Sequence, residues 1–383
     1  MFRKKSDNKN QVVKKPVVKN RNYHAPDNVL IFTFVLALTV GLVLLFSASS
    51  VAAYIRSGSS LYFLKHQLLA IIIGIPLFLF LSRFDYHKYR QMSTAFLIVS
   101  VGLLILTFIP GLGAGYGKAN NWINFYGFSM QPSEFVKVLF ALYLAAFLDT
   151  NKDKLHDFAE SFMPFMVAFA PIAILIMMQP DFGTLLIIFG ASIVSYFVAG
   201  APKKFFVIGI FVALIGITLL VNIKSSKMDR IECYLHPEIG AADKCYQVQQ
   251  SLIAIGSGGF WGRGLGESRQ KFMYLPEVWS DSIFPVVAEE LGFIFSILVI
   301  AIFFLLFWRG IKVAQAAPDL YGKLMATGLA SWIMVQAMLN IGAAINLIPM
   351  TGVPMPFTSA GGSSILALMA TTGILVNISR QTK

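Results

Sequence analysis

The long apolar runs of this chain constrain its fold more than any other feature. A helix needs about 20 consecutive apolar residues to cross the ~30 Å hydrocarbon core of a bilayer. The chain has ten such runs and only 13% charged residues, about half the share found in soluble domains. The pattern predicts an all-α polytopic membrane protein with spans near residues 28–54, 61–82, 94–110, 132–148, 163–178, 182–199, 204–222, 283–307, 322–345 and 361–378.

The placement of Lys and Arg predicts how the chain crosses the membrane, because short cytoplasmic loops are enriched in these residues. Segment 1–27 contains eight basic and two acidic residues. With ten spans, the inward segments contain 20 of the 31 basic residues, and seven of the other 11 lie in the long loop 223–282. Long loops are exempt from the rule. We therefore expect both termini in the cytoplasm and loop 223–282 on the outer face.

Two regions are predicted, a disordered basic tail at 1–27 and one integral membrane domain at 28–380. The tail is poor in large apolar residues. It lacks the apolar stretch and cleavage site of a signal peptide, so the first span is expected to be an uncleaved anchor. The net charge of +12 lies mostly on the tail and inner loops, where anionic lipid rather than nucleic acid is the expected partner.

Nearly all the unusual polar residues fall in segments predicted to face outward, whereas the inner loops are short and ordinary. These outer segments are 111–134, 179–184, 223–282 and 346–364. The asymmetry predicts that the protein works on its outer face. No internal repeat is visible, so a transporter built from inverted repeats receives no support.

The first two outer segments contain several candidate site residues. Trp122 suits the membrane interface, either in an aromatic belt or in a site. Pro132 is expected to begin a helix on which Glu134 and Lys137 share one face, where they pair or line a wet cavity. Asp181 is expected to cap the helix that follows it, although it could instead orient a polar ligand.

The long outer loop combines a predicted membrane-surface helix at 246–259 with a glycine-rich stretch that permits close backbone approach. The cationic side chains of Arg263, Arg269 and Lys271 either receive phosphate oxygens or form a solvated face. Cys233 and Cys245 are the only cysteines, and they form a disulfide if the outside is oxidising; the alternative is two free thiols.

Carboxylates gather where the long loop meets the span 283–307. Glu277 and Asp281 lie at its mouth, where a carboxylate is costly and usually functional. Glu289 and Glu290 lie about two turns further in, roughly 12 Å deeper, and need hydrogen-bond partners.

The segment 349–364 is too rich in Pro and Gly for a regular helix. Irregular backbone at membrane depth must be buried in protein or line a cavity, so this segment is expected to wall the same site. Gln336 and Asn340 precede it on one helix face.

Several strings occur together in one order: NWI…QPSEFVK, QPDFGT, GSGGFWGRGLGESRQKFMYLPE, DSIF…AEELG and PMTGVPMPFTSAGGSS. Over roughly residues 30–380 the chain resembles the SEDS family (shape, elongation, division, sporulation) of peptidoglycan polymerases. The string GLGESRQKFMYLPE is more similar to the division-type (FtsW-like) branch than to the elongation-type (RodA-like) branch.

The resemblance implies a role for individual residues. Asp281 follows the LPE string by four positions and matches the presumed catalytic aspartate of the family. Trp122, Glu134 and Lys137 match functionally sensitive positions, and we add Arg263, Lys271 and Glu277 as substrate-binding candidates.

The chain departs from the family pattern at three places. Asn120 and Asn121 stand where basic residues usually precede the tryptophan, Trp279 and Ser280 replace a His-Thr pair, and Ala360 replaces a tyrosine. The missing basic charge leaves open how pyrophosphate is held, and a divalent cation (Mg²⁺ or Mn²⁺) is one hypothesis.

The resemblance further implies a multi-pass enzyme of the bacterial cytoplasmic membrane that polymerises lipid II at its outer face during cell division. Its expected partners are a class B penicillin-binding transpeptidase and division proteins. Two alternatives remain open: a flippase that moves the same lipid-linked precursor, and a non-catalytic scaffold for division proteins.

Overall fold

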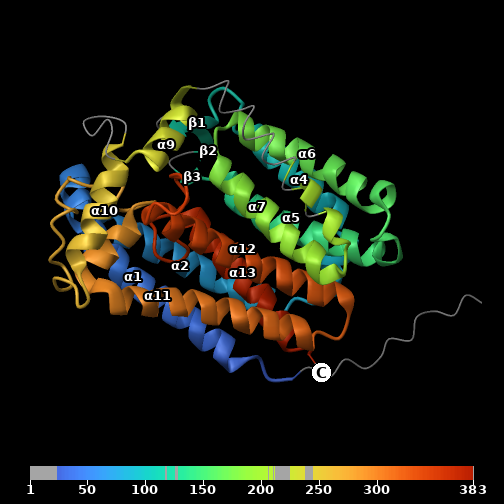
Figure 1. Ribbon diagram of the computed structural model, residues 1–383. Helices are drawn as coiled ribbons and strands as arrows, with labels where there is room; N and C mark the ends of the chain where they lie inside the picture. Colours follow the sequence, from blue (N-terminus) through green and yellow to red (C-terminus); the bar gives the residue numbers. More distant parts are fainter. Residues whose placement is uncertain are drawn as a thin grey trace, which may run out of the picture.

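The computed structural model describes residues 24–382 except 117–118, 126–127, 206, 210, 212–224 and 238–244 (Figure 1). Most of the predicted tail and most of the predicted span 204–222 lie outside the described residues. The elements in chain order are α1 (Asn28–Ser57), α2 (Tyr62–Leu81), α3 (His87–Gln91), α4 (Ser93–Leu106), β1 (Gly113–Tyr116), β2 (Ala119–Phe125), β3 (Phe128–Met130), α5 (Pro132–Thr150), η1 (Lys152–Lys154), η2 (Phe158–Phe162), α6 (Met163–Met178), α7 (Phe182–Ala199), α9 (Ser225–Leu235), α10 (Tyr246–Gly258), α11 (Ile283–Ala316), α12 (Leu320–Ala344) and α13 (Gly362–Ser379).

The predicted all-α membrane fold is confirmed. Within the described residues, seven helices are long and apolar enough to cross a membrane: α1, α2, Phe158–Met178, α7, α11, α12 and α13. Helices α4 and α5 coincide with two further predicted spans. The first has 14 residues, and the second includes Glu134, Lys137 and Asp149. The count of ten spans stays a prediction.

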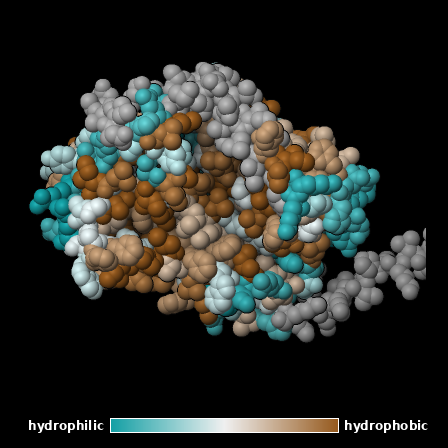
Figure 2. All heavy atoms as spheres, in the orientation of Figure 1, coloured by the Kyte–Doolittle hydropathy of each residue, from teal (hydrophilic) through white to brown (hydrophobic). Residues whose placement is uncertain are grey.

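Helices α12 and α13 form the centre of the bundle. In their most apolar windows 78% and 83% of residues are buried, against 17% in α2 at the edge. Small residues let neighbouring helices approach closely, as in other membrane bundles: a Cβ atom at Gly373 of α13 would lie 2.9 Å from the carbonyl oxygen of Phe78 in α2. Figure 2 shows apolar side chains across the middle of this face and hydrophilic ones at its left and right ends, as expected for a bilayer-spanning protein.

A small antiparallel sheet, which the sequence analysis did not predict, lies between α4 and α5. Its strand order is β1-β2-β3, with Trp122 opposite Ala114 and Asn124 opposite Ser129. Strands β1 and β3 have four and three residues, and the seven residues of β2 do not alternate between apolar and polar, so the segment 111–134 gave no signal for them.

The two ends of the described chain lie at the same end of the bundle (Figure 1). Asp27 caps α1 through Leu30 N, its backbone N–H donates to Ser379 Oγ, and its carboxylate pairs with Arg309. The backbone N–H of His24 donates to the carbonyl of Arg380. Residues 24–27 of the predicted tail are therefore held against the bundle.

Candidate active site

Asp281 lies in the turn that leads into α11, and three main-chain contacts hold this turn against the segment 349–364. The side chain of Asn340 in α12 donates from Nδ2 to the carbonyl oxygens of both Asp281, at 2.8 Å, and Val353, at 2.7 Å. Ser359 Oγ donates to the carbonyl of Ser280, and the N–H of Ala360 donates to the carbonyl of Trp279. The structure thus brings together Asp281 and the segment expected to wall its site.

The carboxylate of Asp281 is held in an unusual environment. The residue is partly exposed, but its Oδ1 atom is buried and has no hydrogen-bond partner among the described residues. Burial raises the pKa of Asp281 from 3.8 to about 6, and the negative charge of Glu277 adds to the rise. The charge of Arg230 and a hydrogen bond from Gln247 oppose the rise without cancelling it. Asp281 is therefore a stronger base than an ordinary aspartate, with one oxygen free to accept a proton.

Two features beside Asp281 are typical of a functional site. Glu277 adopts a left-handed conformation (φ 52°), which costs free energy in a residue with a side chain, and burial raises the pKa of its carboxyl. Gly352 (φ 72°) lies against the aspartate, since a Cβ atom there would be 3.7 Å from Asp281 Oδ2. The backbone of the 349–364 segment therefore lies against one side of the Asp281 carboxylate.

Glu134 and Lys137 form the predicted pair on α5, and the pair is buried. Lys137 Nζ lies 2.8 Å from Glu134 Oε1 and 2.6 Å from Gln336 Oε1, and 4.8 Å from the centre of the Trp332 ring. Gln336 also donates to the carbonyl of Pro354. Lys137 is thus connected through a single side chain to the segment that walls Asp281, and it does not contact Asp281 itself.

Trp122 is half-buried in β2, next to a polar contact that ties the sheet to the bundle. Its neighbour Asn121 donates to Asp181 Oδ2 at 3.2 Å, and Gln131 donates to the same oxygen at 3.4 Å. Asp181 Oδ1 accepts the N–H of Thr184, so the predicted helix cap is confirmed.

Glu289 and Glu290 have the hydrogen-bond partners that their position required. Glu289 accepts from Ser268 Oγ at 2.5 Å and from the backbone N–H groups of residues 269 and 270. Glu290 accepts from Ser47 Oγ at 2.5 Å and from Lys271 Nζ at 2.9 Å. Together these groups fasten the long outer loop to α11 and α1.

Lys271, a candidate for binding substrate phosphate, is buried and paired within the protein. Its side chain is only 4% exposed, and its ammonium group is already paired with Glu290 and the carbonyl of Gly266. A buried cation held by a carboxylate cannot receive a phosphate without leaving that carboxylate unpaired. Arg263 is more accessible, with 31% of its side chain exposed and its Nε 3.5 Å from Glu289.

The glycine-rich stretch fits against a break in α11. Gly292 has φ 73° and ψ −174°, which interrupts the helix. The N–H groups of Arg263 and Gly264 donate to the carbonyls of Glu289 and Glu290, and the N–H of Phe293 donates to the carbonyl of Gly259. The loop supplies partners for backbone groups that the break leaves free. The contact requires glycine, because a Cβ atom at Gly262 would lie 2.2 Å from the carbonyl oxygen of Glu290.

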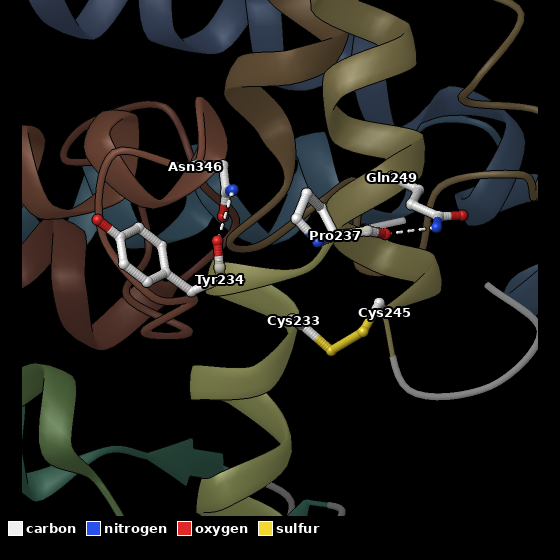
Figure 3. The surroundings of a disulfide bond; sticks show 6 residues. All are labelled: Cys233, Tyr234, Pro237, Cys245, Gln249 and Asn346. Carbon is white, nitrogen blue, oxygen red and sulfur yellow. Dashed lines mark hydrogen bonds between the residues drawn. A yellow bond between two sulfur atoms is a disulfide. The ribbon is translucent and has the colours of Figure 1, made fainter. Parts of the chain in front are cut away.

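A disulfide joins Cys233 of α9 to Cys245 at the start of α10 (Figure 3). The same figure shows Asn346 donating to the carbonyl of Tyr234, which holds α9 beside the end of α12. In this position Arg230 of α9 donates to the carbonyl of Met350. Sequence reasoning did not single out Arg230 or Gln247, because their approach to Asp281 depends on this packing.

Among the residues that the structure describes, no group of three or more His, Cys, Asp or Glu side chains is arranged to hold a metal ion. Asp281 and Glu277 are two carboxylates without a third ligand of that kind. The divalent-cation hypothesis stays a prediction, and we assign no step to a metal.

The fold and the motifs agree with one family. Residues 27–383 match the family described as cell cycle protein and named for FtsW, RodA and SpoVE. The chain belongs to this family. It is therefore a SEDS protein, as the motifs predicted.

Among curated relatives of this SEDS chain, stage V sporulation protein E of Bacillus subtilis (strain 168) is 41% identical over 362 residues, covering 94% of this chain and 98% of that protein. A probable peptidoglycan glycosyltransferase FtsW of Trichlorobacter lovleyi is 38% identical over 353 residues, covering 92% and 93%. The FtsW-named relatives support the FtsW-like branch.

Solved structures show the same fold at lower identity. A chain from a study of a peptidoglycan synthase complex that coordinates polymerization and crosslinking is 24% identical, with a TM-score of 0.76, covering 93% of this chain and 98% of that one. The rod shape determining protein RodA of Thermus thermophilus is also 24% identical, with a TM-score of 0.69, covering 94% and 98%.

Proposed function

We propose that this chain is a peptidoglycan glycosyltransferase that polymerises lipid II into glycan strands, with Asp281 as general base. The observation that supports this most directly is the environment of Asp281. Its pKa is raised to about 6, and its Oδ1 has no partner among the described residues. A general base works best when its pKa lies near the working pH. Family membership and the glycosyltransferase names of several relatives point to the same activity.

The proposed reaction is a single inverting displacement. The 4-hydroxyl oxygen of the acceptor sugar attacks the anomeric carbon of the donor while Asp281 takes the hydroxyl proton. The bond between that carbon and the pyrophosphate oxygen breaks, and undecaprenyl pyrophosphate leaves with the bonding electrons. Inverting glycosidases add a second carboxyl group that protonates the leaving oxygen. Pyrophosphate is a weak base and leaves without that proton, so one carboxylate suffices.

Arg230 is a better candidate than Lys271 for stabilising the departing pyrophosphate. Arg230 is exposed, lies beside Met350 and acts electrostatically on Asp281, whereas Lys271 is buried with Glu290. Preorganised positive charge of this kind lowers the barrier as negative charge develops. Arg263 is the second candidate. Lys137 then acts through Gln336 on the wall of the site, positioned by Glu134, and Trp122 lines the approach from the sheet.

The same proposal places the site at the outer face of the bacterial cytoplasmic membrane, with both termini in the cytoplasm. Lipid II is anchored in that membrane, and the growing strand lies outside it. A class B penicillin-binding transpeptidase is the proposed partner, consistent with the fold shared with a chain of a peptidoglycan synthase complex.

The test is polymerisation in vitro. Purified protein with its cognate transpeptidase receives labelled lipid II in the presence of Mg²⁺, beside an Asp281→Ala control. We expect long glycan strands from the wild type and none from the variant. Equal polymer from both would overturn the base assignment, and no polymer from either, together with lipid II movement across liposomes, would favour the flippase.

The cellular process is proposed to be division, as the FtsW-named relatives suggest. The 41% identity to a stage V sporulation protein makes spore formation the second candidate. Depletion in growing cells separates the two. Filaments that fail to divide support division, whereas normal growth with defective spores supports sporulation.

A further inference from the structure

Helix α11 is much longer than a bilayer requires. Its 34 residues run on both sides of the break at Gly292, whereas about 20 residues cross the hydrocarbon core. Its uncharged part begins at Leu291, directly after Glu289 and Glu290, and ends at Trp308, directly before Arg309. This part measures roughly 27 Å, close to one hydrocarbon thickness. The outer edge of the hydrocarbon therefore falls at Leu291 to Phe293.

The break in α11 lies at this edge. The loop 259–264 is hydrogen-bonded across the break, through Arg263 to Glu289 on one side and through Phe293 to Gly259 on the other. The loop is therefore fixed at the height of the membrane surface. The two backbones pack closely there, since a Cβ atom at Gly292 would lie 2.2 Å from Gly262 N.

The side chains that this loop exposes are large and apolar. Trp261 is 75% exposed and Phe260 69%, and Leu265 is also exposed. The Phe260 ring packs edge-to-face on Phe293, with centroids 6.0 Å apart. Phe293 is itself exposed on α11, so the loop continues the surface that α11 presents to lipid.

Residue chemistry also favours lipid as the partner of this loop. Trp is enriched where membrane meets water, because its ring is apolar and its N–H is polar. Trp308 occupies that position at the other end of the uncharged part of α11. At the outer end of this part, α11 has Phe293 and Phe295 but no tryptophan, and the loop supplies Trp261. Arg263 and Arg269 lie on the same loop, where they can meet lipid phosphates.

We infer that residues 260–265, here called the interface loop, insert into the outer headgroup region of the bilayer and anchor the long outer loop there. The occupant of this apolar surface is phospholipid. Asp281 precedes the break at Gly292 by eleven positions, so the anchor also fixes the outer end of the segment that leads from Asp281 to the break. The inference does not depend on the reaction that Asp281 performs.

Spin-label accessibility tests the anchor directly. The two native cysteines are bridged, so an introduced cysteine is the one free thiol. Trp261→Cys is labelled with a nitroxide in the full-length protein in phosphatidylcholine–phosphatidylglycerol liposomes. Phe295→Cys on the exposed face of α11 serves as the lipid reference, and Glu267→Cys, exposed on the same outer loop, as the water reference.

We expect the ratio of oxygen to nickel-chelate accessibility at position 261 to exceed that at position 267 at least twofold and to lie below that at position 295. Equal ratios at 261 and 267 would overturn the anchor. If the label is accessible to nickel chelate in liposomes but becomes shielded when a transpeptidase is added, the loop is instead a protein-docking surface. A label-free check is quenching by brominated lipid, which should be weaker in Trp261→Phe than in the wild type.

Discussion

Asp281 and the Glu289–Glu290 pair lie on one short stretch of chain, yet their carboxylates differ in their hydrogen-bond partners. Both oxygens of Glu289 accept hydrogen bonds, and so do both oxygens of Glu290. Asp281 instead has a buried oxygen without a partner among the described residues. A satisfied buried carboxylate stabilises the structure, whereas an unsatisfied one stores free energy that a substrate can use. The comparison agrees with a structural role for the two glutamates and with the proposed catalytic role of Asp281.

The largest expected effect comes from Asp281→Asn. Removing the base should lower the polymerisation rate by about 10²–10⁴-fold, the usual contribution of general base catalysis. The same substitution should raise the thermal unfolding temperature at pH 7.5, because it removes a charge whose burial is uncompensated. Rate and unfolding temperature are measured on the same preparation. Loss of both activity and stability would mean that Asp281 is structural like its neighbours.

Lys271→Met is expected to lower stability rather than the polymerisation rate. It leaves Glu290 charged and buried without its cation, which costs about 3–5 kcal/mol of stability. Chemical denaturation or thermal unfolding in detergent measures the loss. In Lys271→Met/Glu290→Gln the uncompensated charge is gone, so part of the stability should return. A stable single variant that fails to polymerise would instead restore Lys271 to the substrate site.

The features that the sequence predicted correctly are local. Pro132 at the start of α5, the Glu134–Lys137 pair and the Asp181 cap each depend on residues within one helical turn. The long apolar runs predicted most of the helices for the same reason. The need of Glu289 for partners was also visible, since a carboxylate beside an apolar run must be satisfied.

The features that the sequence did not predict depend on contacts between distant segments. The break at Gly292 and the burial of Lys271 both follow from the docking of the loop 259–271 onto α11. The approach of Arg230 to Asp281 requires α9 to be held by the disulfide and by Asn346. No spacing in a single segment encodes these pairings.

The pH dependence of the rate sharpens the comparison at Asp281. With a pKa of about 6, the general base is protonated below pH 6, so kcat/KM should fall tenfold per pH unit there and level off above it. The pKa is raised on folding. The contribution of Asp281 to stability is therefore most favourable below about pH 4 and decreases as pH rises toward 6.

Glu277→Gln provides the matched control for this profile. Removing the neighbouring negative charge should move the midpoint of the rate profile to lower pH, because Glu277 raises the pKa of Asp281. An unchanged midpoint in Glu277→Gln would mean that another group titrates in the wild type.

The smallest effect is expected for Asn340→Ala, which leaves the carboxylate in place and removes what positions it. Its two donated hydrogen bonds hold the carbonyls of Asp281 and Val353, and losing them should lower kcat by about tenfold, equivalent to roughly 1.4 kcal/mol. KM should change little, since Asn340 is buried behind the site. Asn377 is a matched control at the other end of the bundle, where its side chain is likewise buried and bridges main-chain groups of residues 82 and 86. Both variants should lower the unfolding temperature by a similar amount, but Asn377→Ala should leave kcat unchanged. Equal losses of kcat in the two variants would mean that Asn340 contributes only to stability.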